Sequence, residues 1–298
     1  MVLSWIRGFK FCSMDKLSTG EGKIYQWHET AKIEEAGGLV SFVKKYEPGS
    51  YEIKNELSWL LSTMVRACDN FSVPNIKEAS VEQGVIKMEF IENSQGKPLE
   101  EVINFLVQSA AELHSLIKSD KPKLRDPIGA TEYGQFLKKY TEKRVDALAG
   151  TEYELPPEIA QWILQRLEQL KSKFFTIVHR DLRARHLLFP TDLAKTKPVL
   201  IDWEFSNISE PAQDLAKLIY DVTTLGMDFK AAKLKIIEPY SYITKISQEE
   251  LEGKVNAFLP LIPLERDMSL IKRKPDGYEK EILRDLYFLK ALYEEQEK

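Results

Sequence analysis

Hydrophobic and polar positions change their spacing near residue 95. Before it, KIYQWHETAKI at 23–33, LVSFVKKY at 39–46 and GVIKMEFI at 84–91 predict short strands, because their apolar residues alternate or form brief runs beside turn residues. Between the last two, EIKNELSWLLSTMV at 52–65 repeats apolar residues at helical spacing and predicts a helix. The first part of the chain is therefore expected to be β-rich.

Helical spacing dominates after residue 98. It is strong in LEEVINFLVQSAAELHSLIK at 99–118 and in PPEIAQWILQRLEQLKSKF at 156–174, and it returns from Asp214 to the C-terminus. Two short apolar strands, TIVH and VLIDW, lie between these helices, and NSQGKP at 93–98 has the Gly, Pro and Ser content of a hinge.

These patterns predict an α+β fold of two lobes. We expect a small mixed β-sheet in an N-lobe at residues 1–93 and a larger, mainly helical C-lobe at residues 94–298. A chain of 298 residues is long enough for one large domain or two modest ones.

Composition excludes several classes of function. The 42 Lys and Arg residues against 46 Asp and Glu give a net charge of -4, so no bulk positive field attracts nucleic acid or an anionic membrane. No apolar run approaches the roughly 18 residues of a membrane span, and MVLSWIRGFKF is a poor signal peptide because charges interrupt it. Cys12 and Cys68 lack zinc-site spacing, so we expect plain thiols, no disulfide and a cytoplasmic location.

Candidate chemistry is concentrated in HRDLRARHLLF at 179–189 and VLIDW at 199–203. The first is a polar loop between apolar TIV and LLF, and the 21 residues from Asp181 to Asp202 suit two strands of a hairpin that presents both carboxylates to one cleft. Phosphoryl transfer needs a carboxylate at the attacking hydroxyl, metal ligands at the phosphates and a cation that holds the nucleotide. The two motifs supply candidates for the first two.

The same residues resemble the aminoglycoside phosphotransferase and choline kinase family, whose members share a protein-kinase-like fold. The resemblance rests on HRDLRARHLLF followed by VLIDWEFSNISEPAQDLAKLI, and it extends to AAELHSL at 110–116, FVKKY at 42–46 and EIKNELSWL at 52–60. It implies a nucleotide-binding N-lobe, a C-lobe with the catalytic loop, metal site and acceptor-binding helices, and an active site in the cleft between them.

The resemblance also implies roles for three acidic residues. Asp181 would be the catalytic base and Asp202 a magnesium ligand. Asp214 would brace the catalytic loop, although an ordinary helix N-cap would look the same in the sequence.

For the nucleotide, the resemblance assigns Lys44 to the α- and β-phosphates and Glu56 as its ion-pair partner. Neighbouring residues on a strand point to opposite faces, so Lys44 and Lys45 cannot both enter the cleft, and Lys45 remains the alternative. Glu52 is the alternative to Glu56, because it lies one helical turn earlier on the same face.

Two further segments are expected to contact the nucleotide. Gly20 and Gly22 in STGEGK at 18–23 would let backbone amides approach phosphates. MEFIE at 88–92, with Glu89 and Ile91, aligns with the hinge that binds the purine through backbone groups. Backbone recognition leaves the choice between ATP and GTP open.

Arginines make the catalytic loop cationic. Arg183 and Arg185 stand two and four positions after Asp181, where a basic residue can neutralise the transferring phosphoryl group. We expect one of them at the γ-phosphate and another at an anionic acceptor, which argues against a polycationic aminoglycoside. Salt bridges to helix carboxylates are the alternative for one or two of the arginines, with Arg180 among them.

These features favour a kinase of small hydroxyl-bearing molecules. DWEF is not DFG, and only 11 residues lie between Asp202 and Asp214, which leaves no room for a protein-kinase activation segment. A kinase acting on RNA or another macromolecule is the second hypothesis, from the basic stretch IKRKPDGYEK at 271–280, and an inactive kinase-like binding module is the third. Aromatic residues of the C-terminal helices would line the acceptor site or fill the core: Tyr220, Phe229, Tyr240, Tyr242 and Phe258.

His186 occupies the loop position where asparagine usually supplies a metal ligand. A ring nitrogen is a softer ligand than an amide oxygen and suits Mn²⁺ better than Mg²⁺. One branch of the resembled family, the aminoglycoside 2''-phosphotransferases, also ends its HxDxxxxH loop with histidine. We therefore expect His186 and Asp202 to hold Mg²⁺ or Mn²⁺ in an active enzyme.

Overall fold

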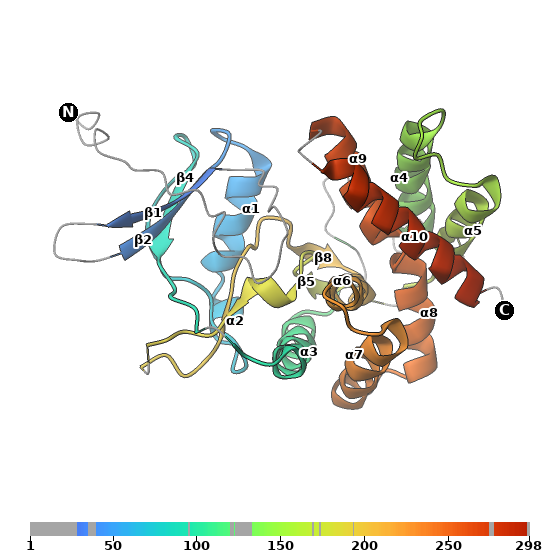
Figure 1. Ribbon diagram of the computed structural model, residues 1–298. Coiled ribbons are helices and arrows are strands. Elements are labelled where there is room, and N and C mark those ends of the chain that lie inside the picture. Colours follow the sequence, from blue (N-terminus) through green and yellow to red (C-terminus); the bar gives the residue numbers. More distant parts are fainter. Residues whose placement is uncertain are drawn as a thin grey trace. The chain divides into compact units, whose positions relative to one another are not determined.

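The structure is a computed structural model (Figure 1). It describes residues 29–34, 40–94, 96–119, 122, 133–168, 170–172, 174–192, 194–273 and 277–296. By its internal contacts the chain divides into two compact units. Unit 1 comprises residues 1–97 and 185–206, and unit 2 comprises residues 98–184 and 207–298.

A four-stranded sheet is the centre of unit 1. Its strands are β1 (Glu29–Glu34), β2 (Val40–Lys45), β3 (Ile76–Ser80) and β4 (Val85–Glu89), in the order β1-β2-β4-β3. All three pairings are antiparallel, so the expectation of a mixed sheet is wrong for the strands described. Consecutive strands joined by short connections pair antiparallel, and β1–β2 and β3–β4 are both of this kind.

Two short helices replace the single helix predicted at 52–65. They are α1 (Tyr51–Leu60) and α2 (Thr63–Arg66), and Ser62 between them accepts a hydrogen bond from the N–H of Val65 as the N-cap of α2. Helix α1 lies against β4, and its apolar residues Ile53 and Leu60 are fully buried. The helix therefore stands beside the sheet, as Figure 1 shows.

A hairpin completes unit 1. Strands β6 (Leu187–Leu188) and β7 (Val199–Leu200) pair antiparallel. The N–H of Ser72 donates to the carbonyl of Pro198, and the N–H of Leu200 donates to the carbonyl of Ser72. These bonds attach the hairpin to the segment after α2. A hairpin therefore does lie between Asp181 and Asp202.

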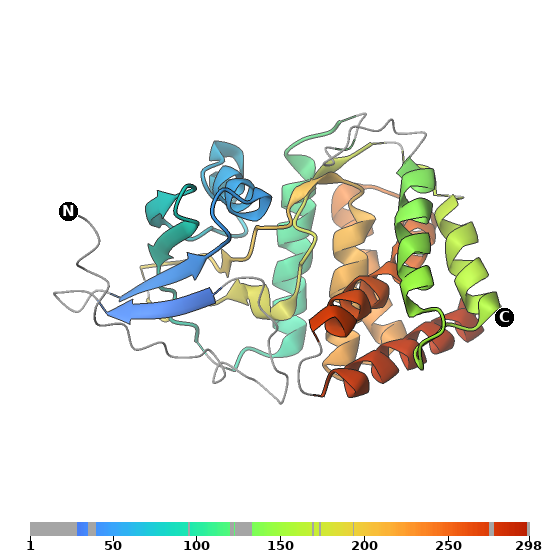
Figure 2. The ribbon, with the colours of Figure 1, turned by 90° about the horizontal axis from the view of Figure 1, so that it is seen from above.

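Unit 2 is mainly helical. Its helices are α3 (Leu99–Ser115), α4 (Tyr133–Leu148), α5 (Pro157–Glu168), α6 (Ala212–Thr224), α7 (Phe229–Thr244), α8 (Gln248–Phe258), α9 (Leu261–Arg273) and α10 (Tyr278–Gln296). Strands β5 (Thr176–Val178) and β8 (Asn207–Ser209) form its only described sheet. Helix α3 packs on α7 and α4 packs on α5, as both ribbon views show (Figures 1 and 2).

Helix α6 is deeply buried in unit 2. Its residues from Asp214 to Tyr220 are all buried, and α7, α8, α3 and α9 contact it. Tyr240 and Phe258 belong to the surrounding core, whereas Tyr242 is exposed. The C-terminal aromatics are thus mostly packing residues.

The chain crosses between the units inside the predicted catalytic loop, between Ala184 and Arg185, and returns after Ser206. The predicted lobe boundary after residue 93 stays a prediction. Within the described residues, no helix combines the length and apolar character that crossing a bilayer needs. Cys68 is a buried thiol outside any described disulfide, and its Sγ lies 3.8 Å from the carbonyl oxygen of Met64.

Candidate active site

Lys44 and Glu56 form a buried ion pair in unit 1. The Nζ atom of Lys44, on β2, lies 3.1 Å from Oε1 and 2.9 Å from Oε2 of Glu56, on α1. Lys44 is 4% exposed and Glu56 is 1% exposed, whereas Lys45 is exposed and Glu52 is half-buried. Strand alternation explains the contrast between the two lysines. Of the residues predicted as alternatives, the structure brings Lys44 and Glu56 together.

A second carboxylate, Asp202, contacts the same ammonium. Its Oδ1 lies 2.8 Å from Lys44 Nζ, and Glu204 Oε2 lies 3.7 Å from it. Burial disfavours the charge on Lys44, but the carboxylates of Asp202, Glu56 and Glu204 outweigh this effect and raise its pKa. Lys44 is therefore held as a cation among three acidic residues.

His186 lies on the other side of the Asp202 carboxylate. Its Nε2 is 3.4 Å from Asp202 Oδ2, and Nε of Arg185 donates to the same Nε2 at 3.1 Å. A guanidinium can only donate, so Nε2 acts as an acceptor and the hydrogen-bond network assigns the ring proton to Nδ1. Two lone-pair atoms, one from imidazole and one from carboxylate, therefore face each other.

This pair fits a divalent metal ion. Octahedral Mg²⁺ has ligands at 2.0–2.1 Å, which sets neighbouring ligand atoms about 3 Å apart, close to the observed separation of 3.4 Å. A neutral imidazole and a carboxylate are both metal-binding forms. An ion held by Nε2 would replace Arg185 at the nitrogen lone pair.

Backbone conformation marks two positions of the predicted motifs. Among the described residues other than glycine, only Arg180, Asp202 and Lys245 have positive φ, at 65°, 72° and 61°. Lys245 ends helix α7 as its left-handed C-cap. Arg180 precedes the candidate residue Asp181, and Asp202 is itself a candidate site residue. Such conformations cost of order 1–3 kcal/mol each and persist where the surroundings impose them.

Helix α1 also fixes the segment that follows Asp202. Nδ2 of Asn55 donates to the carbonyls of Glu204 and Ser206 at 2.8 and 2.7 Å, and Nε1 of Trp59 donates to the latter at 2.9 Å. Glu56 and the anchors of the Asp202 segment therefore come from one helix. The roles of Asn55 and Glu204 were not visible in the sequence, because nothing in their spacing marks them.

Asp214 braces the start of the predicted catalytic loop in unit 2. Its Oδ2 accepts the N–H of His179 at 2.7 Å and its Oδ1 accepts the N–H of Arg180 at 2.6 Å. His114 Nε2 lies 3.1 Å from Oδ2, and its Nδ1 lies 2.7 Å from the hydroxyl of Tyr240. The carboxylate thus binds the loop instead of capping its own helix, α6.

Asp181 is buried beside two cations of unit 2. Nε of Arg183 lies 2.7 Å from Asp181 Oδ1, and Nζ of Lys217 lies 3.1 Å from the same oxygen. The first contact was within reach of sequence reasoning, since the two residues are neighbours in the loop. The second was missed, because Lys217 lies 36 residues further along the chain on α6.

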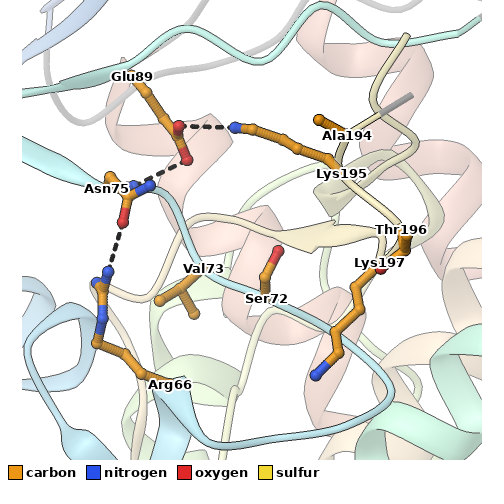
Figure 3. Close-up of a pocket in the computed structure, with 9 residues that line it drawn as sticks. All are labelled: Arg66, Ser72, Val73, Asn75, Glu89, Ala194, Lys195, Thr196 and Lys197. Carbon is orange, nitrogen blue, oxygen red and sulfur yellow. Dashed lines mark hydrogen bonds and ion pairs between the residues drawn. The ribbon is translucent and has the colours of Figure 1, made fainter. Parts of the chain in front are cut away.

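A pocket of about 300 Å³ lies within unit 1 (Figure 3). Glu89 at the end of β4 takes part in it: Oε2 accepts from Lys195 Nζ at 2.6 Å and Oε1 accepts from the N–H of Asn75 at 3.0 Å. The N–H of Glu89 in turn donates to the carbonyl of Asn75. Both the side chain and the backbone amide of Glu89 therefore form hydrogen bonds at this pocket. Ile91, two residues later, is buried. Gly20 and Gly22 lie outside the described residues.

Comparison with solved structures identifies the fold. The choline kinase LicA from Streptococcus pneumoniae is 16% identical, with 91% of this chain and 92% of that chain covered and a TM-score of 0.61. The macrolide 2'-phosphotransferase MphH from Brachybacterium faecium is 13% identical, with coverages of 89% and 90% and a TM-score of 0.58. The GDP and kanamycin complex of APH(2'')-IIia is 16% identical, with coverages of 91% and 92% and a TM-score of 0.60. These likenesses confirm the kinase-like α+β fold.

Sequence comparison identifies the family. No protein of curated function matches the sequence significantly. The model of the phosphotransferase enzyme family matches residues 71–238, which is more than half of the chain and includes both predicted motifs. The resemblance predicted from those motifs is thereby confirmed: the chain belongs to the phosphotransferase enzyme family.

Proposed function

We propose that this phosphotransferase moves the γ-phosphate of ATP or GTP to a hydroxyl group of a small molecule. Family membership supports the reaction class. The similar structures support the acceptor class, since their names refer to kanamycin, a macrolide and choline, which are small hydroxyl-bearing compounds.

One observation carries the proposal most strongly. Asp202 directs Oδ1 to Lys44 and Oδ2 to His186. One carboxylate therefore contacts both the lysine proposed to bind nucleotide phosphates and the histidine proposed to bind the metal ion. Its positive φ is the backbone feature expected of a residue held for function. An inactive binding module has no need for such a strained carboxylate.

Donor binding is assigned to side chains of unit 1. Lys44, held in place by Glu56, would contact the α- and β-phosphates. His186 and Asp202 would hold Mg²⁺ or Mn²⁺, which neutralises phosphate charge when bound. Arg185, released from the His186 nitrogen, becomes available to a phosphate oxygen.

The chemical step is assigned to the catalytic loop. The acceptor oxygen attacks the γ-phosphorus, the bond from that phosphorus to the bridging oxygen breaks, and the nucleoside diphosphate leaves. Asp181 orients the acceptor hydroxyl and takes its proton, while Arg183 neutralises charge on the phosphoryl group in transfer.

Label transfer from γ-labelled ATP and GTP to pools of small metabolites and of RNA tests the proposal. We expect a labelled small-molecule product that disappears in Asp181→Asn and Asp202→Asn, while Asp146→Asn, an exposed helical aspartate, behaves like the wild type. Label in RNA alone would support the macromolecular alternative. Nucleotide binding without transfer to either pool would identify a binding module.

A further inference from the structure

Lys217 is a cation in a buried helix face. Helix α6 is buried from Asp214 to Tyr220, and Lys217 is 8% exposed. It is the one cationic residue in the sequence AQDLAKLIYDV at 212–222. Withdrawing an ammonium from water is costly unless an anion compensates for it. An apolar residue would avoid this cost at a buried position, so we infer that the charge of Lys217 has a function.

Its anionic partner is already engaged by another cation. Lys217 Nζ and Arg183 Nε lie 3.1 Å and 2.7 Å from the same oxygen, Oδ1 of Asp181. Burial and the neighbouring guanidinium of Arg183 lower the pKa of Lys217, and they outweigh the opposing effect of the Asp181 and Glu265 carboxylates. A further anion at this place would therefore stabilise both cations.

The nearby carboxylates have other partners. Asp221 accepts the N–H of Ala184 through Oδ2 at 2.9 Å, and Glu265 Oε1 lies 3.6 Å from Arg180 Nη2. Asp181 itself must meet the acceptor hydroxyl, and two cations on one of its oxygens weaken it as a proton acceptor. A cation that leaves Asp181 during catalysis needs an anion from the substrate.

The division of the chain indicates which substrate supplies that anion. Lys217, Arg183 and Asp181 belong to unit 2, whereas Lys44, His186 and Asp202, the proposed donor-binding residues, belong to unit 1. Lys217 is therefore in the same unit as Asp181, the residue proposed to meet the acceptor hydroxyl. This favours the acceptor as the source of the anion.

We propose that the acceptor carries a carboxylate or phosphate group and that Lys217 binds it, while Arg183 faces the phosphoryl group in transfer. Hydrogen bonds of about 2.8 Å to Asp181 and to Lys217, whose polar atoms are 3.1 Å apart, place the anionic oxygen and the reacting hydroxyl oxygen within about 9 Å of each other. Hydroxy acids and sugar phosphates have this form. The inference rests on the proposed function and narrows its substrate class.

A charge-matched acceptor panel tests the inference on the wild-type protein. Hydroxy acids and sugar phosphates are compared with neutral polyols and with amino sugars of the same carbon skeleton, as acceptors of label from ATP or GTP. We expect at least about tenfold higher kcat/KM for anionic acceptors, the gain typical of a charge-assisted hydrogen bond. The carboxylate and phosphate arms show which of the two anions fits better. A preference for neutral or cationic acceptors overturns the inference and leaves the proposed function intact.

Variants then test the assigned residue. Lys217→Met is expected to raise KM for anionic acceptors by about 10- to 100-fold, and Lys217→Arg to recover part of that loss. Lys230→Met, which removes an exposed lysine from α7, should leave KM unchanged. Equal losses of kcat for neutral and anionic acceptors would show that Lys217 serves the transferring phosphate instead. Absence of transfer to every acceptor class would overturn the proposed function and the inference together.

Discussion

The ammonium of Lys44 lies 2.9 Å from Oε2 of Glu56, and both side chains are almost fully buried. The hydroxyl of Tyr46 donates to the same carboxylate. Such a pair is weak evidence for stability by itself, because desolvation offsets the attraction. Removing one partner of a buried ion pair is nevertheless costly, since the remaining charge stays buried without compensation.

Lys44→Met is therefore expected to lower both stability and activity. It leaves Glu56, Asp202 and Glu204 without their shared cation, which should reduce the free energy of unfolding by about 3–5 kcal/mol. Lys45→Met, at the exposed neighbouring position, should change it by less than about 0.5 kcal/mol. Urea unfolding and the KM for nucleotide measure the two effects. A larger rise in the KM for nucleotide in Lys45→Met than in Lys44→Met would assign nucleotide binding to Lys45.

His186 should set the metal preference. Imidazole nitrogen is a better ligand for Mn²⁺ than for Mg²⁺, and an amide oxygen suits Mg²⁺. His186→Asn should therefore shift the ratio of activities in limiting Mn²⁺ and Mg²⁺ toward Mg²⁺ by about tenfold, or about 1.4 kcal/mol. The measurement is a metal titration of phosphoryl transfer for both proteins. Equal activity of His186→Ala and wild type at limiting metal contradicts the ligand assignment.

Local rules account for part of this arrangement. Alternation along β2 separates Lys44 from Lys45, whereas helical spacing left Glu52 and Glu56 on one face of α1 and the structure shows Glu56 as the buried one. The apolar segments around 179–189 and 199–203 formed short strands at the expected places. For the strands, the deciding interaction spans only a few residues.

Contacts between distant residues were beyond sequence reasoning. Lys217 meets Asp181 across 36 residues. Residues 214–220 of α6 are all buried, so the sequence pattern around Lys217 does not mark it as a residue of the site. Asp214 looked like a helix cap, and only the folded chain shows its bonds to the amides of His179 and Arg180. The pattern also missed β3, whose residues are mostly exposed.

Asp214→Asn should destabilise the protein while keeping the shape of the side chain. The amide has one acceptor oxygen where the carboxylate has two, so at least one buried N–H of His179 or Arg180 loses its partner. We expect a loss of about 3 kcal/mol in the free energy of unfolding.

Asp228→Asn is the matched control for this substitution. Asp228 caps α7 by accepting from the N–H of Ala231 at 3.0 Å, and asparagine caps helices about as well as aspartate. Denaturant midpoints of the two variants and the wild type give the comparison. If Asp214→Asn is as stable as Asp228→Asn, the loop does not depend on the Asp214 carboxylate.

Asp267 should make the stability of unit 2 depend on pH. Its side chain is fully buried on α9; burial, followed by the charge of Asp285, raises its pKa to about 9. In the unfolded chain its pKa is near 4, so at neutral pH folding takes up a proton. The free energy of unfolding should therefore fall as pH rises from about 4 to about 9, by at most about 1.4 kcal/mol per pH unit from this group.

Asp267→Asn supplies a neutral side chain of the same size and should remove this dependence. Its amide is neutral and can donate a hydrogen bond, as a protonated carboxyl group can. The variant should thus be more stable than the wild type at pH 8 and nearly equal to it at pH 4. Thermal or urea unfolding across this range measures the difference, with Asp146→Asn as the exposed control. A difference that is constant with pH would mean that Asp267 is ionised in the folded protein.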